Sequence, residues 1–412
     1  MRILVVGGGG RESALIWHLH QWGHVLLAAP GNGGTEPLAR RAAVDPLDPG
    51  ALVALARAER IDLVVVGPEA PLARGVADAL AAAHLPVLGP TRAAARIETE
   101  KSFAKALMAE ASVPTASARL IGSPAELIPL LEGPPGPRAL VLKADGLAGG
   151  KGVVVVEDAV EAPRVAAELL ARHGPPLLVE ERLEGPELSV IALTDGERLV
   201  PLPPARDHKR LEEGNRGPNT GGMGAIAPAG APAPAGELAA DLISPVLAAL
   251  RARGTRFQGF VYAGLMLTAH GPRVLEYNAR LGDPEAQALV PLIAEDLGAR
   301  MAQAAAGALD PAPLALSPRR AVAVVLCAEG YPDHPRRGDE ITGVAAAQSL
   351  PGVLVFPAGV RREGSRLFTD GGRVLTVVGV GDDLGSARSA AYGGASRIAF
   401  FGMRLRRDIG LA

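Results

Sequence analysis

The sequence predicts a protein of several domains that combines α/β with α+β architecture. Its 412 residues exceed what one hydrophobic core usually supports, so we expect roughly two to four domains. Residues 1–100 alternate short apolar runs with helical stretches, as parallel α/β domains do. Residues 310–318 contain three prolines and predict a linker, after which strand patterns dominate. We therefore expect an N-terminal parallel α/β domain (1–100), a central domain (101–310) and a C-terminal β-rich domain (319–412).

The N-terminal domain is expected to alternate strands and helices along its whole length. Its short apolar runs are rich in valine, leucine and isoleucine, which is typical of strands buried on both faces. The predicted strands are Ile3–Val6, Val25–Ala29, Leu63–Val66 and Pro86–Leu88, and the predicted helices are Glu12–Trp22, Pro49–Arg60 and Leu72–Ala83.

The rest of the chain mixes strands and helices without strict alternation. Helical patterns in the central domain cover Glu100–Glu110, Glu237–Arg253 and Glu285–Ala306. In the C-terminal domain the predicted strands are Ala321–Cys327, Val353–Pro357 and Arg373–Val380, followed by a closing helix over Asp383–Phe400.

Composition excludes several classes of function. No apolar run approaches the roughly 18 residues that a membrane span requires, so we expect no membrane partner. A net charge of -2 and 3% aromatic residues indicate neither a phosphate-neutralising surface nor a base-stacking platform, so nucleic acid is not an expected partner. Cys327 is the only cysteine, which excludes an internal disulfide and a cysteine-based zinc site. The N-terminus lacks a secretory apolar segment, and we expect a cytoplasmic protein.

Lysine is rare in this chain and unevenly placed. Only five of the 42 basic residues are lysines, and all five lie between residues 101 and 209. An ammonium group is a compact point charge that suits phosphate oxygens, so the clustering indicates a site for a phosphate-rich ligand. The alternative is that an arginine-rich composition thins lysine everywhere and leaves the five together by accident. The lysines are Lys101, Lys105, Lys143, Lys151 and Lys209.

Two of these lysines flank a glycine-rich loop between two apolar strands, Leu140–Lys143 and Val153–Val156. The loop is not a Walker A motif, because Asp145 occupies the place of the first glycine and Gly152 replaces the serine or threonine. Such a hairpin can fold over a triphosphate, with Lys143 reaching in from the strand and Lys151 from the loop. A plain glycine-rich hairpin without a ligand is the alternative.

Gly7–Glu12 follows the first strand and opens the first helix, where backbone N–H groups can approach an anion. Glu12 occupies the place of the third glycine of a dinucleotide motif, and no ribose-binding acid follows Ala29, so NAD is disfavoured. A phosphate-bearing ligand at this sheet edge remains one interpretation, with help from the loops around Asn32 and Glu69. Tight turns that bind nothing are the other.

Two stretches of the central domain carry polar residues next to strands. The period of two places Glu276, Asn278 and Arg280 on one face of the predicted strand 274–280, where carboxylate and amide oxygens suit Mg²⁺ and Arg280 suits a carboxylate or phosphate. An exposed strand edge is the alternative. Asp283 is expected to cap the following helix. Residues 178–187 contain several acids at the end of a strand, which is a weak signal for an adenine and ribose site. Solvent-exposed acids at a turn are the commoner explanation.

Residues 207–210, Asp-His-Lys-Arg, concentrate charge and precede a flexible polar loop over 217–224 that is able to close over a small polar substrate. A solvated run of charges is an equally good interpretation. His208 has no partner at zinc-like spacing, so we expect no metal binding by histidine.

Motifs along the whole chain together resemble one known family. They are Gly7–Glu12, Ala29–Asn32, Val66–Glu69, Lys143–Gly146 with Gly149–Gly152, Asp207–Arg210, Gly217–Gly224, Gly282–Glu285 and Gly371–Leu375. In combination they resemble the phosphoribosylamine–glycine ligases, also called glycinamide ribonucleotide synthetases, of the ATP-grasp superfamily. The resemblance implies a central ATP-grasp domain with a small mobile lid at about 118–182, in a monomer or homodimer.

The resemblance implies a ligase that uses ATP to condense glycine with 5-phosphoribosylamine in de novo purine synthesis. The γ-phosphate would pass to the glycine carboxylate, and the ribosylamine nitrogen would then attack the glycyl phosphate. Phosphate leaves more readily than a carboxylate oxygen. Such chemistry needs charge neutralisation and alignment rather than a protein nucleophile.

The resemblance also implies roles for individual residues. ATP would be bound by Lys105, Lys143, Lys151, Glu180 and Glu187. The metal ion, Mg²⁺ or Mn²⁺, would be held by Glu276 and Asn278. The glycine and transferred phosphoryl group would be lined by the catalytic residues Arg280, Asp207 and Lys209. Phosphoribosylamine would be received by Gly9, Gly10, Arg11, Asn32 and Glu69.

The chain departs from the usual family pattern at several positions, which are Ser13, Glu100, Arg206, Leu281 and Pro357. The strand 262–267 also lacks an acid that many ATP-grasp enzymes carry, so metal ligation is expected to be sparser. Two readings compete with the glycine ligase, namely an ATP-grasp ligase for another carboxylate and amine, and a nucleotide-binding regulator without catalysis. A nicotinamide-dependent dehydrogenase is a remote third alternative, because the ribose-binding acid is missing.

Overall fold

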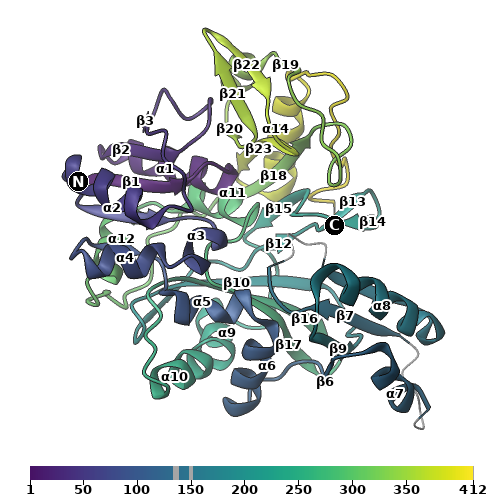
Figure 1. Cartoon of the computed structure of the whole chain (residues 1–412). Coiled ribbons are helices and arrows are strands. Elements are labelled where there is room, and N and C mark those ends of the chain that lie inside the picture. The colour runs from purple at the N-terminus through teal and green to yellow at the C-terminus, as the bar shows by residue number, and fades with distance from the viewer. Residues whose placement is uncertain (133–138, 148–151, 412) are drawn as a thin grey trace.

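The computed structural model describes residues 1–132, 139–147 and 152–411 and shows a parallel α/β part, a central part and a C-terminal β-rich part (Figure 1). This architecture confirms the fold class predicted from the sequence. Lys151 and most of the glycine loop before it lie outside the described residues. In the described part of the chain, no helix combines the length and apolar character needed to cross a membrane.

The N-terminal part is built on a parallel sheet with the strand order β3-β2-β1-β4-β5. Its central strands are aliphatic and buried on both faces because helices cover them, which is the usual state of a parallel sheet. All predicted strands are confirmed, whereas the two-residue strand β3 has no apolar pattern and was missed. The strands are β1 (Arg2–Gly7), β2 (Val25–Pro30), β3 (Arg40–Arg41), β4 (Leu63–Val66) and β5 (Val87–Leu88).

The helices of this part begin and end at residues with clear local causes. Asp48 caps one of them by accepting a hydrogen bond from the N–H of Ala51, and Thr91 caps another in the same way. The single helix predicted over 72–83 is wrong, because Gly75 takes a left-handed φ of 80° and separates two helices. The helices are α1 (Gly10–Gln21), α2 (Pro49–Ala58), α3 (Glu69–Ala73), α4 (Val76–Ala82), α5 (Arg92–Thr99) and α6 (Lys101–Glu110).

The central part contains two four-stranded antiparallel sheets. One has the order β6-β9-β7-β8 and is covered by α8; the other has the order β11-β10-β16-β17. The first consists of β6 (Ala118–Ile121), β7 (Leu140–Ala144), β8 (Val153–Val156) and β9 (Leu177–Glu181), with η1 (Pro124–Leu127), α7 (Ile128–Glu132), η2 (Ala159–Glu161) and α8 (Ala162–His173). The second consists of β10 (Glu187–Thr194), β11 (Leu199–Pro201), β16 (Gly259–Thr268) and β17 (Gly271–Asn278).

Two long helices predicted in the central part are wrong, because each is interrupted near a proline. Pro245 lies in the first turn of the second of two helices, where its missing N–H cannot continue the hydrogen-bond ladder of the first, and the two helices separate at Ile243. Pro291 similarly lies in a short 3-10 turn that separates two more. The resulting elements are α9 (Ala235–Leu242), α10 (Ser244–Ala252), α11 (Glu285–Leu289), η3 (Val290–Leu292) and α12 (Leu297–Ala305).

The C-terminal sheet extends across the predicted linker at 310–318. Its order is β12-β15-β18-β23-β20, so that strands from residues 206–227 pair with strands that follow residue 319. This pairing places Asp207, in β12, beside the C-terminal part. The remaining elements are β12 (Arg206–Asp207), β13 (Arg210–Glu212), β14 (Arg216–Asn219), β15 (Gly224–Ala227), β18 (Arg320–Cys327), β19 (Glu340–Ile341), α13 (Val344–Gln348), β20 (Val353–Pro357), β21 (Val360–Glu363), β22 (Arg366–Thr369), β23 (Arg373–Gly381) and α14 (Leu384–Ala395).

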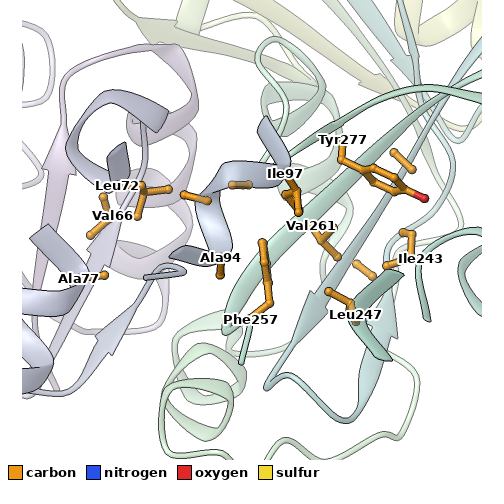
Figure 2. Close-up of a cluster of buried hydrophobic side chains, with 14 of the residues drawn as sticks. Val66, Leu72, Ala77, Ala94, Ile97, Ile243, Leu247, Phe257, Val261 and Tyr277 are labelled. Atoms are coloured by element: carbon orange, nitrogen blue, oxygen red, sulfur yellow. The ribbon is translucent and has the colours of Figure 1, made fainter. Parts of the chain in front are cut away.

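One hydrophobic core joins the N-terminal part to the central part (Figure 2). Val66 and Leu72 contribute from the N-terminal side, and Phe257, Val261 and Tyr277 from the central side. The Tyr277 hydroxyl donates a hydrogen bond to the Leu242 carbonyl, so its polar end is satisfied within the core. The strand β17, which carries the candidate metal residues, is therefore anchored by buried contacts.

Replacing Phe257 with alanine is expected to destabilise the protein by about 3–5 kcal/mol, because a fully buried ring leaves a cavity. Phe257 is 1% exposed. Thermal unfolding should show the loss as a lower midpoint. Trp22 is 47% exposed, and Trp22→Ala serves as the control with little change expected. Equal losses in the two variants would contradict this account of the core.

Candidate active site

A buried lysine and a partly buried one share one carboxylate where the two central sheets meet. Lys105 of α6 and Lys143 of β7 each place Nζ 2.7 Å from a different oxygen of Glu180 in β9. Lys143 also donates to the Leu275 carbonyl of β17 at 3.0 Å. Burial lowers the pKa of Lys105, although Glu180 opposes this effect. Two ammonium groups against one carboxylate leave a surplus positive charge, which suits an anionic ligand.

A third lysine lies beside the same cluster. Lys101 at the start of α6 donates to the carbonyls of Ala144 (2.9 Å) and Gly146 (2.8 Å), at the point where β7 enters the glycine-rich loop. The Asp145 carboxylate accepts hydrogen bonds from the backbone and side chain of Ser102. The N-terminus of α6 is therefore tied to the base of the loop. Lys101 belongs to the lysine cluster in the sequence, but no motif predicted a role for it.

Lys209 joins two acids from different strands. Its Nζ lies 3.0 Å from Glu187 of β10 and 3.4 Å from Glu276 of β17. Burial alone would lower the pKa of Lys209, but Glu187 and Glu276 raise it well above its usual value. Burial alone would likewise raise the pKa of Glu276, yet Lys209, Lys143 and Lys101 lower it. Glu276 is therefore ionised near neutral pH.

Glu276 and Asn278 offer oxygen ligands from the same face of β17, as the period of two predicted. An ionised carboxylate and an amide oxygen are hard donors, so the pair fits Mg²⁺ or Mn²⁺ that takes its other ligands from phosphate and water. In the part of the chain that the structure describes, no group of three or more histidine, cysteine or acidic side chains could hold a metal by itself.

The amide of Asn278 has a defined orientation. We assign the orientation that directs its nitrogen at Glu98, because the nitrogen then donates to Glu98 Oε1 at 3.1 Å and to the Tyr277 carbonyl at 3.2 Å, whereas the opposite orientation sets the amide oxygen against acceptors. Glu98, in α5, also accepts from the Ala279 N–H at 2.7 Å. Burial raises the pKa of Glu98 to about 7, although the charge of Arg280 opposes this shift. Glu98 was not predicted as a site residue, because an acid on an amphipathic helix is common.

Arg280 lies between two acids at the boundary of the N-terminal and central parts. It pairs with Glu69 at 2.7 Å and with Glu98 at 2.9 Å. Burial alone would lower the pKa of Arg280, but the two acids raise it. Arg11 and Arg280 both donate to the Leu281 carbonyl at 3.1 Å and line one pocket between the two parts. Three residues predicted for two different substrates, Arg11, Glu69 and Arg280, therefore lie together.

Asp207 contributes an acceptor that the described residues do not satisfy. Its Oδ1 is buried and accepts no hydrogen bond from them. Burial raises the pKa of Asp207 well above its ordinary value, and the nearby Glu285 carboxylate raises it further. Glu285 accepts a hydrogen bond from Ser189 at 2.8 Å, and the Ser189 hydroxyl lies 3.1 Å from that of Tyr262. Ser189 and Tyr262 were not predicted as site residues, since β10 and β16, far apart in sequence, bring them here, and Glu285 of α11 was part of a motif but was given no role.

The N-terminal glycine loop is closely packed by the protein itself. A Cβ atom on Gly8 would lie 2.5 Å from the Gly31 carbonyl oxygen, and one on Gly10 would lie 2.4 Å from Gln287 Nε2. The Glu12 carboxylate accepts from the N–H of Gly9 at 2.7 Å and so occupies part of the helix N-terminus where an anion was expected. Internal packing thus accounts for much of this glycine pattern.

The other predicted residues of this loop are also hydrogen-bonded within the protein. Arg11 is 5% exposed and pairs with Glu12 at 2.6 Å. Asn32 donates to the carbonyls of Gly8 (3.0 Å) and Pro357 (3.1 Å), which links the loop to the C-terminal part. Arg11 and Asn32 would have to exchange these bonds to contact a ligand.

The prediction that Asp283 caps the following helix is wrong. The helix α11 begins at Glu285, and Asp283 instead pairs with Arg373 of β23 at 3.1 Å and accepts from the Gln287 side chain at 2.7 Å. The guanidinium of Arg373 attracts the carboxylate across the boundary between the central and C-terminal parts, which outweighs local capping. Arg373 also donates to the Gly221 carbonyl of the polar loop.

The structure brings most predicted residues into neighbouring groups. One group surrounds Glu180, another surrounds Lys209, and the Leu275 carbonyl that binds Lys143 directly precedes Glu276 and so connects them. A further group joins the N-terminal loop to β17. The respective members are Lys105, Lys143 and Glu180; Lys209, Glu187 and Glu276; and Arg11, Glu69 and Arg280.

Family models match the chain over nearly its whole length. The phosphoribosylglycinamide synthetase N domain matches residues 1–98, the ATP-grasp (A) domain residues 99–286 and the C domain residues 321–412. The phosphoribosylamine–glycine ligase of Streptomyces coelicolor is 47% identical over 99% of this chain and 98% of its own. That of Mycobacterium leprae is 46% identical over 100% of this chain and 98% of its own.

Solved structures give the same relationship. The phosphoribosylamine–glycine ligase of Thermotoga maritima has a TM-score of 0.86 at 34% identity and covers 99% of this chain and 100% of its own. A biotin carboxylase of Campylobacter jejuni has a TM-score of 0.74 at 15% identity, covers 100% of this chain and 94% of its own, and shares the fold alone. The chain therefore belongs to the phosphoribosylglycinamide synthetase family of ATP-grasp ligases.

Proposed function

We propose that this protein uses ATP to ligate glycine to 5-phosphoribosylamine, giving glycinamide ribonucleotide, ADP and phosphate in de novo purine biosynthesis. The observation that carries the proposal is the match to phosphoribosylamine–glycine ligases over essentially the whole chain, with 47% identity to one of them. The pairing of two lysines, Lys105 and Lys143, with the single carboxylate of Glu180 in the ATP-grasp part supports it independently.

The triphosphate of ATP is proposed to bind beside Glu180. Lys105 and Lys143 share this one carboxylate, so phosphate oxygens would serve as further anionic partners of the two ammonium groups. Lys151 would close over the phosphates from the loop, and Glu187 would accept hydrogen bonds from the ribose hydroxyls. The lysines would neutralise charge that develops on the transferred phosphoryl group.

Glu276 and Asn278 are proposed to hold Mg²⁺ or Mn²⁺, which would neutralise phosphate charge and align the triphosphate. The Lys209 ammonium group lies 3.4 Å from Glu276 and would contact the phosphoryl group as it passes from ATP to glycine. The buried acceptor of Asp207 would receive a hydrogen bond from the ammonium group of glycine, whose carboxylate would face Lys209 and Arg280. These groups bind and align the reactants, and none needs to form a covalent bond with them.

Phosphoribosylamine is proposed to bind at the boundary of the N-terminal and central parts. Glu69 and Arg280 reach this boundary from opposite sides, and Arg11 lines the same pocket as Arg280. Backbone groups of Gly9 and Gly10 and the side chain of Asn32 would contribute after exchanging internal hydrogen bonds. The amine would thereby be placed next to the glycyl phosphate formed in the central part.

Release of ADP is expected to require glycine and phosphoribosylamine together. A panel of amino acids, each assayed with ATP, Mg²⁺ and phosphoribosylamine, tests the assignment by coupled detection of ADP. We expect release with glycine at least about 10²-fold faster than with alanine, since a site that accepts only hydrogen at Cα excludes a methyl group. ADP release without glycine dependence would instead favour a ligase for another carboxylate.

A further inference from the structure

We propose that Glu98 is a positioning residue that orients the Asn278 amide for metal binding and holds Arg280 beside it. The inference rests on the proposed metal site at Glu276 and Asn278. Glu98 belongs to α5, which packs against β17 (Figure 1). It is 9% exposed, and none of the motifs in the sequence includes it.

Both carboxylate oxygens of Glu98 accept hydrogen bonds from residues at and just after the end of β17. Oε2 accepts from the Ala279 N–H at 2.7 Å. Oε1 lies 2.9 Å from the Arg280 guanidinium and, in the orientation assigned to the Asn278 amide, accepts from its nitrogen at 3.1 Å. One carboxylate therefore binds three consecutive residues, through one backbone donor and two side-chain donors.

This arrangement determines which atom of Asn278 is available to a cation. Only the oxygen of an amide can ligate Mg²⁺ or Mn²⁺, and a free amide can present either end. Glu98 takes the nitrogen of Asn278, which turns the oxygen away from Glu98. Outer partners of this kind hold metal ligands in place, and their loss typically costs about 10–100-fold in metal affinity.

If Glu98 had only a structural role, fewer hydrogen bonds to its carboxylate would be enough. Anchoring α5 to β17 requires only the bond to the Ala279 N–H, which any acceptor could provide. An ionised carboxylate only accepts hydrogen bonds, so the two oxygens of Glu98 can satisfy all three donors at once. Glutamine cannot replace it, because either orientation of its amide sets an NH₂ group against the Ala279 N–H or against the Asn278 and Arg280 donors.

The test is Mn²⁺ binding to the full chain in the presence of ADP, measured by paramagnetic resonance of the free ion. We expect Glu98→Gln to weaken Mn²⁺ binding about tenfold or more. The double variant Glu98→Gln/Asn278→Asp exchanges carboxylate and amide, keeps the net charge, and is expected to recover most of the affinity. Glu100→Gln is the matched control, since Glu100 lies two residues away, is half-exposed and pairs with Arg96.

The outcomes separate the inference from the function on which it rests. Unchanged Mn²⁺ affinity in Glu98→Gln would overturn the positioning role, and so would a loss that the double variant fails to recover. ADP affinity without metal reports whether each variant retains a folded nucleotide site. If the unsubstituted protein and Glu276→Ala bind Mn²⁺ equally, the metal assignment itself fails and the inference falls with it.

Discussion

Replacing Glu276 with alanine is expected to reduce the ligation rate by about 10²-fold or more while the fold remains intact. Glu276 is the one ionised carboxylate of the proposed metal pair, and its pKa is lowered by the surrounding lysines against the effect of burial. Without it, Asn278 would offer a single neutral ligand. Lys209 would keep its ion pair with Glu187 at 3.0 Å, so its ammonium group is not left unpaired. Initial rates at saturating substrates measure the effect.

ATP affinity distinguishes a metal role from general damage in this variant. We expect Glu276→Ala to bind ATP more weakly only when Mg²⁺ is present, because the metal-free nucleotide does not use this carboxylate. Glu110→Ala is the matched control: its side chain is 43% exposed against 36% for Glu276, and it pairs with Arg253 outside the site. Turnover equal to that of the unsubstituted protein would refute the metal assignment at β17.

The strands of the site could be predicted from local pattern, but their partners could not. Alternation over 274–278 predicted that Glu276 and Asn278 share a face, and the apolar runs around the glycine loop predicted the hairpin of β7 and β8. The pairing of β12 and β15 with the C-terminal sheet depends on contacts about 100 residues apart, as for Ala225 opposite Ala323. No local pattern encodes such a register, so the surroundings of Asp207 were not predicted.

The predicted helix lengths were wrong for a different reason. Hydrophobic periodicity continues through Gly75, Pro245 and Pro291, because the residues on both sides bury the same face. A missing N–H group or a left-handed glycine nevertheless ends the hydrogen-bond ladder. Periodicity thus predicted which side of the chain is buried and overestimated the length of each helix.

The chemistry of the site was predictable where residue type was unusual. Five lysines in one stretch of an arginine-rich chain indicated a phosphate site, and the structure places three of them, Lys101, Lys105 and Lys143, around the start of the glycine loop and Glu180. Acids are common on helix surfaces, so nothing distinguished Glu98 in the sequence, and Glu285 stood only at the end of a motif without a role of its own. Arg280 was expected to face substrate, and in the structure it is paired with Glu69 and Glu98.

Replacing Lys143 with methionine is expected to lower kcat/KM for ATP by about 10²-fold or more, with little change in stability. Methionine retains the length of the side chain but removes its charge. Glu180 is 2% exposed and would be costly to leave unpaired, yet Lys105 remains 2.7 Å from its other oxygen. The cluster of two ammonium groups and one carboxylate therefore becomes neutral rather than negative. The positive charge that is lost is the surplus available to phosphate.

A purely structural lysine would behave in the opposite way. If Lys143 served only to neutralise Glu180, Lys143→Met would lower the midpoint of thermal unfolding, and adding Glu180→Gln would restore both stability and turnover. We expect the double variant to remain impaired in ligation, because Glu180→Gln cannot replace an ammonium group at the phosphates. Arg119→Met removes an exposed cation from β6 of the same sheet and should leave kcat/KM unchanged. Full activity of Lys143→Met would show that the surplus charge of this cluster does not act on ATP.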